Sequence, residues 1–378
     1  MIDDCRLKES FFNQQSTIDN RQSQGNHQST IDHRQSKGNQ QSTIDNPIAT
    51  LPPCHFALHV INKVLDGKHL IMKRREKTMR RFTRTPYYTG PNDPERGQIR
   101  GTLQLGETVI IETIGGADGD LYPGVVPELT TPRGSRPGGP FVIEGIKPGD
   151  WVAIEILDME VGPYGYYNNG GPFRGSLRSV APVRDGLLHF PPDFVVPIKP
   201  MIGVIQLEPV SQHPCAWNHG GNMDYNSICP GSTVYIRAQK EGGYLFLGDV
   251  HARMSDGELT GTGVEIDAVI TLKVNRVPGF PTGGIVVETA DAYFTCGMGA
   301  NWEEALKVAW ADMVALISHL YDTTAEHANL IVGTIGDAVP GYAAGTLNSR
   351  GFQQGTPYVT CQISITKELR RTGEPFKP

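Results

Sequence analysis

Four side chains that can bind a metal ion or move a proton fall within one short stretch: Asp249, His251, Asp256 and Glu258. Carboxylates and an imidazole so close together suit either a divalent cation or an acid/base pair that activates water. Because side chains alternate between faces along an extended chain, Asp249 and His251 are predicted to share a face at a strand end. A solvated polar hairpin loop is the alternative interpretation.

A second polar group lies upstream, in residues 218–224, ahead of the next expected strand. Its paired glycines, Gly220 and Gly221, let backbone amides approach a ligand or ion closely. His219, Asn222 and Asp224 add three polar side chains. If the two stretches meet in space, they provide the composition of a hydrolytic metal site.

The elements that must position these residues are mainly strands. Apolar residues alternate over 151–157, 234–239, 244–247 and 359–365, and most clearly over 264–274, where Glu265 falls on the polar face. The chain also has 44 glycines and 28 prolines, which favour turns. Many short strands with frequent turns predict a β-sandwich or barrel.

Helices are expected only near the C-terminal end. Asn301 is a candidate N-cap, and apolar residues from Trp302 to Leu320 follow helical spacing. We interpret this apolar stripe as core packing. A capping box at Thr323–Glu326 opens a second predicted helix through Val332.

Charge, hydropathy and cysteine spacing argue against several classes of function. The formal net charge of −6 argues against a nucleic-acid-binding surface, and no apolar run is long enough to cross a membrane. None of the six cysteines forms a C-x-x-C pair, so we expect free thiols in a reducing cytoplasm and no zinc–cysteine site. A cytoplasmic protein acting on small molecules is the prediction.

The first part of the chain has a different character. A Gln-, Ser- and Asn-rich motif at 13–20 returns at 26–33 and at 39–46. Such a sequence cannot bury enough apolar surface to offset chain entropy. We therefore expect residues 1–85 to be a disordered tail and linker, with Met72 and Met79 as alternative starts, and residues 86–378 to form one catalytic domain.

Several motifs then occur in a fixed order. They are residues 139–150, residues 190–194 leading into 200–203, the block Gly220-Gly221-Asn222-Met223-Asp224, and Gly248-Asp249-Val250-His251-Ala252 with Asp256-Gly257-Glu258. Together they resemble the acetamidase/formamidase family over roughly residues 95–366. Met254-Ser255 stands where that family often has Gln-Gly.

This resemblance implies a mainly β protein with C-terminal helices, built as a jelly-roll-like sandwich or barrel. It also implies a homo-oligomer that hydrolyses a short-chain amide to a carboxylate and ammonia. The substrate stays open between formamide, acetamide and a larger amide.

For the mechanism we expect Asp224, Asp249 and His251 to bind a divalent metal, with zinc as the first choice and calcium as the second. Glu258 or Asp256 would take the proton from the attacking water, and Glu144 is a rival base. The assignment of ligands and bases is open among these residues.

The developing oxyanion would be held by the metal or by the Gly220–Gly221 amides, with Asn222 beside them. A metal-free amidase is the alternative enzyme, because Cys215 and Cys229 flank His219. A non-catalytic β-sandwich that binds a small ligand is the alternative outside catalysis.

Overall fold

The computed structural model describes residues 79–84, 98–115, 138–168, 178–207, 218–342 and 359–373. All of them lie within one compact unit, Arg74–Pro378. The repeats at 13–46 and the alternative start Met72 lie outside the described residues. The predicted boundary between tail and domain near residue 85 also falls in a stretch that is not described.

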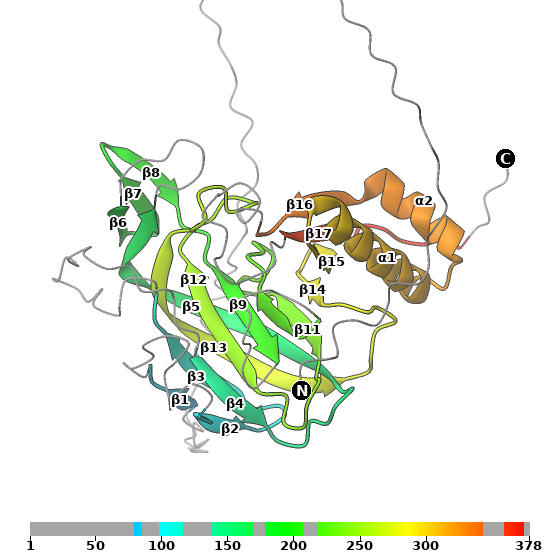
Figure 1. Ribbon diagram of the computed structural model, residues 1–378, viewed down its shortest axis with the longest axis horizontal. Helices are drawn as coiled ribbons and strands as arrows, with labels where there is room; N and C mark the ends of the chain where they lie inside the picture. The colour runs from blue at the N-terminus through cyan, green and yellow to red at the C-terminus, as the bar shows by residue number, and fades with distance from the viewer. Residues whose placement is uncertain are drawn as a thin grey trace, which may run out of the picture. The chain divides into compact units, whose positions relative to one another are not determined.

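The described chain is mainly β, with two helices near its C-terminal end, as the sequence predicts (Figure 1). The early strands are β1 (Arg80–Phe82), β2 (Gly101–Leu103), β3 (Thr108–Thr113), β4 (Gly138–Ile143), β5 (Trp151–Asn168), β6 (Arg178–Arg184), β7 (Leu187–Phe190), β8 (Phe194–Pro197) and β9 (Met201–Leu207). The later elements are β10 (Gly220–Asn222), β11 (Thr233–Arg237), β12 (Leu245–His251), β13 (Glu265–Val277), β14 (Val286–Glu288), β15 (Ala292–Gly299), α1 (Trp302–Leu320), α2 (Ala325–Ile335), β16 (Asp337–Pro340) and β17 (Val359–Thr366).

The strands form two layers. One layer has the order β2-β4-β12-β9-β10. The other runs β1-β3-β13-β5-β11-β14-β15-β17-β16, and β6, β7 and β8 extend it from the end of β5. Figure 1 shows β9 and β12 in front of β5 and β13. Among the described strands neither layer closes on itself, so the architecture is a sandwich rather than a barrel.

The main core fills the space between these layers. Leu245 and Leu247 of β12 and Ile270 and Leu272 of β13 are fully buried in it. Burial of each such side chain contributes about 1.5–3 kcal/mol to stability. The regular alternation of β13 therefore places its apolar face in the core, as predicted.

A second core lies between α1, α2 and strands β15 and β17. The side chain of Asn301 accepts a hydrogen bond from the Glu304 amide, which confirms the first predicted N-cap. The second helix begins one residue later than the capping box at Thr323–Glu326 predicts, because Thr324 is its N-cap and accepts from the His327 amide. The predicted core stripe is only partly correct, because Trp302 and Leu320 at the two ends of α1 are exposed. Neither described helix has the length and apolarity needed to cross a membrane.

Candidate active site

The two layers are joined by one residue pair between β12 and β13, and that pair is His251 and Glu265. His251 ends β12 and Glu265 begins β13, so the site lies at the edge where the two layers are joined. The Nε2 atom of His251 is 3.2 Å from Oε1 of Glu265 and 3.8 Å from Oδ1 of Asp249. His251 is completely buried, so it belongs to the strand framework and is not a solvated loop residue.

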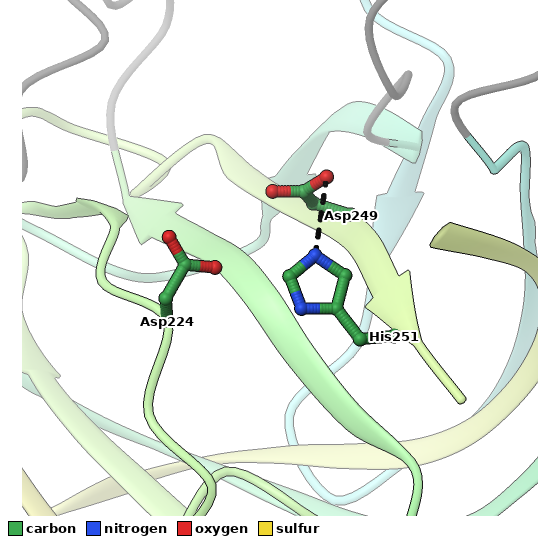
Figure 2. A group of neighbouring side chains, drawn as sticks. All are labelled: Asp224, Asp249 and His251. Carbon is green, nitrogen blue, oxygen red and sulfur yellow. Dashed lines mark ion pairs between the residues drawn. The ribbon is translucent and has the colours of Figure 1, made fainter. Parts of the chain in front are cut away.

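Asp224 reaches the same point from the segment that follows β10, the neighbour of β9 (Figure 2). Gly203 of β9 lies between the two aspartates: a Cβ atom there would be 2.5 Å from Oδ1 of Asp224 and 2.9 Å from Oδ2 of Asp249. Only a glycine leaves room for both carboxylates at this position. The two polar stretches that are separate in the sequence therefore meet across β9.

Two overlapping groups of possible ligands result. The ligand atoms of Asp224, Asp249 and His251 lie within 4.8 Å of one another, and so do those of His251, Glu258 and Glu265. His251 belongs to both groups. We call these five residues the acid–histidine cluster.

Three residues of the cluster have an unusual backbone. Asp224, Asp249 and Glu258 have φ angles of 52°, 56° and 45°. This left-handed region is sparsely populated by residues other than glycine and costs on the order of 1–3 kcal/mol for each such residue. Asp249 thus departs from the regular strand geometry on which the predicted alternation rests. Such strain concentrates at functional sites, where packing holds side chains in fixed directions.

Burial controls the charge of the carboxyl groups. It raises the pKa of Asp224 to about 7 and that of Glu265 to about 8, and it holds the pKa of Glu258 well above its usual range. The negative charges of neighbouring carboxylates add to this effect for all three groups. The surrounding protein therefore disfavours the simultaneous ionisation of these carboxyl groups.

For the His251 imidazole, burial and the neighbouring charges change the pKa in opposite directions. Burial by itself would lower the pKa of His251, but the carboxylates of Glu265 and Asp249 outweigh it and hold that pKa well above its usual range. One imidazole thus faces four carboxyl groups.

The cluster fits a divalent cation. Within the described chain, both oxygens of Asp224, Nδ1 of His251 and Oε2 of Glu265 are buried without a hydrogen-bond partner. Buried polar atoms are normally satisfied, and buried charges are normally paired or bound to a metal. A mixed oxygen and nitrogen donor set suits zinc, and an all-carboxylate subset suits calcium.

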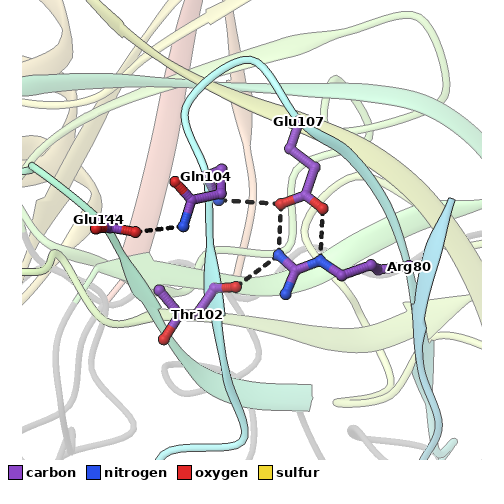
Figure 3. A network of polar contacts seen from close by, with 5 residues as sticks. All are labelled: Arg80, Thr102, Gln104, Glu107 and Glu144. Atoms are coloured by element: carbon purple, nitrogen blue, oxygen red, sulfur yellow. Dashed lines mark hydrogen bonds and ion pairs between the residues drawn. The ribbon is translucent and has the colours of Figure 1, made fainter. Parts of the chain in front are cut away.

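Two of the predicted bases lie elsewhere. Asp256 is exposed and accepts a hydrogen bond of 2.7 Å from Nδ2 of Asn226. Glu144 is exposed in the turn after β4 and accepts from the side chain of Gln104, within the network that Figure 3 shows. Neither belongs to the acid–histidine cluster, whereas Glu258 does.

The residues expected to hold the oxyanion lie in β10. Gly220 and Gly221 pair with Gln206 and Ile205 of β9, and both have positive φ angles. The side chain of Asn222 acts on the neighbouring Asp224, where it opposes the rise in pKa that burial causes.

The cysteines of the alternative mechanism gain no support. Cys215 lies outside the described residues. Cys229, in the turn before β11, forms no disulfide, and it is not among the described groups of side chains that could share an ion.

Glu265 is the residue that the sequence interpretation missed. Its place on the polar face of an alternating strand suggested exposure, but its side chain is only 10% exposed. No pattern in the sequence identifies it, because the expected strands 244–247 and 264–274 do not bring Glu265 opposite His251. The structure makes this pair by extending the first strand to His251 and starting the second at Glu265.

The sequence and the fold both have known relatives. The model of the acetamidase/formamidase family matches residues 206–285, which include all five residues of the cluster. A putative formamidase of Schizosaccharomyces pombe is 26% identical, and the match covers 36% of this chain and 50% of that protein. The chain thus spans about half the length of this relative.

Two solved structures are similar over most of their length. An acetamidase of Bacillus halodurans is 28% identical with a TM-score of 0.61, covering 71% of this chain and 91% of that one. A predicted acetamidase/formamidase of Thermoanaerobacter tengcongensis is 27% identical with a TM-score of 0.61, covering 71% and 89%. These matches confirm the resemblance that the sequence motifs indicate.

Proposed function

We propose that this chain, which matches the acetamidase/formamidase family through its site region, hydrolyses a short-chain amide to a carboxylate and ammonia. The observation that carries the proposal is the acid–histidine cluster, in which both carboxylate oxygens of Asp224 and Nδ1 of His251 are buried without hydrogen bonds. Formamide and acetamide are the first substrates to test, because relatives bear those names.

Asp224, Asp249 and His251 would hold a divalent cation, with zinc expected before calcium. Such an ion supplies Lewis acidity and lowers the pKa of water toward neutrality. Its positive charge would also favour the ionised form of the cluster's carboxyl groups. Glu265 adds a contact to Nε2 of His251, which fixes the orientation of the imidazole.

Glu258 is the residue best placed to move a proton. It is buried beside Asp224, His251 and Glu265, and its pKa lies well above its usual range because of that burial. A general base works best when its pKa is close to the working pH. Glu258 would accept the proton of the attacking water and return it to the departing ammonia.

The oxyanion would be stabilised by backbone amides at Gly220 and Gly221, with Asn222 beside Asp224. Donors that are fixed before the reaction contribute most to such stabilisation. The pairing of β10 with β9 provides that rigidity.

A panel of amides tests the activity. Purified protein is expected to release ammonia from formamide, acetamide or a longer primary amide, to lose this activity after exhaustive chelation, and to regain it with Zn²⁺ or Ca²⁺. Full turnover after chelation would favour the metal-free amidase. Binding of an amide without ammonia release would favour the non-catalytic binding protein.

Two variants distinguish the candidate bases. Glu258→Gln is expected to lower kcat by about a hundredfold or more while the protein still binds the cation, because it removes the proton acceptor but keeps the shape. Asp256→Asn is the matched control and should keep kcat within about threefold, since Asp256 is exposed and outside the cluster. Steady-state kinetics of both proteins decides, and the reverse ranking would reinstate Asp256.

The assembly and the location of the protein stay predictions. Phe194 and Val195 of the edge strand β8 are 65% and 55% exposed, which supports a partner surface on this part of the sandwich. A homo-oligomer agrees with the resemblance, and a reducing cytoplasm agrees with the absence of disulfides at Cys229, Cys296 and Cys361.

A further inference from the structure

The segment that carries Asp224, residues 223–227, begins the connection from β10 to β11 and contains no helix or strand. Strand β9 anchors its peptide groups on one side, where the amides of Met223 and Asp224 donate to the Gly203 carbonyl at 2.9 and 3.2 Å. The Met223 carbonyl also accepts from the Tyr342 amide at 3.2 Å. The left-handed backbone of Asp224 and its carboxylate without hydrogen bonds need a further restraint to keep one orientation.

Strand β17 provides that restraint from the C-terminal part of the chain. The hydroxyl of Thr360 donates to the Met223 carbonyl at 2.7 Å. The Tyr225 hydroxyl donates to the carbonyl of Cys361 at 2.9 Å, and the Ser227 hydroxyl donates to Oε1 of Gln362 at 2.9 Å. Three consecutive residues of β17 thus hold every second residue of the segment.

These contacts are buried and closely packed. Thr360 is fully buried, and Tyr225 and Gln362 are 1% and 2% exposed. A Cβ atom at Gly341 would lie 2.3 Å from the Thr360 hydroxyl and 2.4 Å from the Met223 carbonyl, so the backbones meet directly. Hydrogen bonds in such dry surroundings are strong and specify one arrangement.

We propose that Thr360, assisted by Gln362, is a positioning residue that sets the direction of the Asp224 carboxylate from outside the acid–histidine cluster. Strand β17, which packs against α1 and α2, thereby supports the site, although it contributes none of the described residues of the cluster. This inference rests on the proposed function, because it gives Asp224 the role of a cation ligand.

The test compares three variants of the full chain. Thr360→Val replaces the hydroxyl with a methyl group, and Thr360→Ser keeps a hydroxyl. Thr295→Val is the matched control: Thr295 is also fully buried in the same sheet, and its hydroxyl donates to the Ala309 carbonyl of α1 at 2.7 Å. Calorimetric titration of chelator-treated protein with Zn²⁺ gives the affinity of each variant.

Thr360→Val is expected to weaken Zn²⁺ binding by about tenfold or more, the effect of removing a group that orients a ligand. Thr360→Ser should restore binding to within about threefold of wild type, because the donor returns. Thr295→Val should leave the affinity unchanged. Equal affinity in Thr360→Val and wild type, or equal losses in Thr360→Val and Thr295→Val, would overturn the proposal.

Hydrogen exchange gives a readout that needs no cation. In Thr360→Val the amides of residues 223–228 should exchange about tenfold faster than in wild type, while in Thr295→Val they should not. If wild type binds no Zn²⁺, the proposed metal function fails and the exchange rates alone decide the positioning role. Unchanged exchange in Thr360→Val would then refute it.

Discussion

Replacing His251 with alanine is expected to abolish stoichiometric cation binding and to lower amide turnover by at least about a hundredfold, the scale of losing one directed catalytic interaction. His251 belongs to both groups of possible ligands, so its loss affects the whole cluster. Elemental analysis and ammonia release on purified wild type and His251→Ala measure the two effects.

The stability of this variant should also change. A loop side chain would contribute little to folding, but His251 is fully buried opposite Glu265. Its removal leaves the buried carboxyl groups of Glu265 and Asp249 without their partner, which should lower the unfolding free energy by about 1–3 kcal/mol.

Two controls keep this experiment decisive. His319→Ala changes an exposed histidine in the last turn of α1 and should retain both metal and turnover. Added Zn²⁺ should raise the melting temperature of wild type, because a ligand that binds only the folded state stabilises it, but not that of His251→Ala. A His251→Ala protein that keeps its metal and its turnover would refute the proposed site.

The variant Gly203→Ala is expected to disable the site without removing any of its chemical groups. The added methyl carbon would lie 2.5 Å from Oδ1 of Asp224 and 2.9 Å from the Asp249 carbonyl and carboxylate, closer than real Cβ contacts allow. Both aspartates must therefore move. We expect cation affinity to fall by about tenfold to a hundredfold and the unfolding free energy to fall by about 1–3 kcal/mol from overpacking.

Gly162→Ala is the matched control for this change. Gly162 is also a strand glycine, in β5, but a Cβ atom there would be 3.5 Å from Cβ of Asp267, an ordinary contact. It should bind Zn²⁺ with wild-type affinity in the same calorimetric titration. If Gly203→Ala also binds normally, the close approach of Asp224 and Asp249 across β9 is not needed for the site.

Much of the framework is predictable from local sequence. The alternation over 264–274 corresponds to β13, the predicted cap Asn301 opens α1, and α2 opens at Thr324, one residue after the start of the predicted capping box. These features depend on residues close together in the chain: side-chain periodicity sets the faces of a strand, and capping side chains bind amides within one turn. The motifs around Asp224 and His251 were likewise sufficient to indicate the family resemblance.

The membership of the cluster was decided by tertiary structure. Glu258 and Asp256 are two residues apart with similar chemistry, yet only Glu258 is buried with His251. The left-handed backbone of Glu258 and the packing around it make this difference, and no periodic pattern reports either. Glu144 was excluded in the same way, because its turn lies in a separate polar network (Figure 3).

The sequence determined which residues have the chemistry for a hydrolytic site, because that depends only on their types. Tertiary structure alone brought Asp224 beside Asp249 across Gly203, and Glu265 opposite His251. Strand pairing between distant segments made both contacts, and the pairing is selected by the burial of whole sheet faces. Periodicity shows that a strand has two faces, but the burial of Glu265 follows from the layer that packs against it.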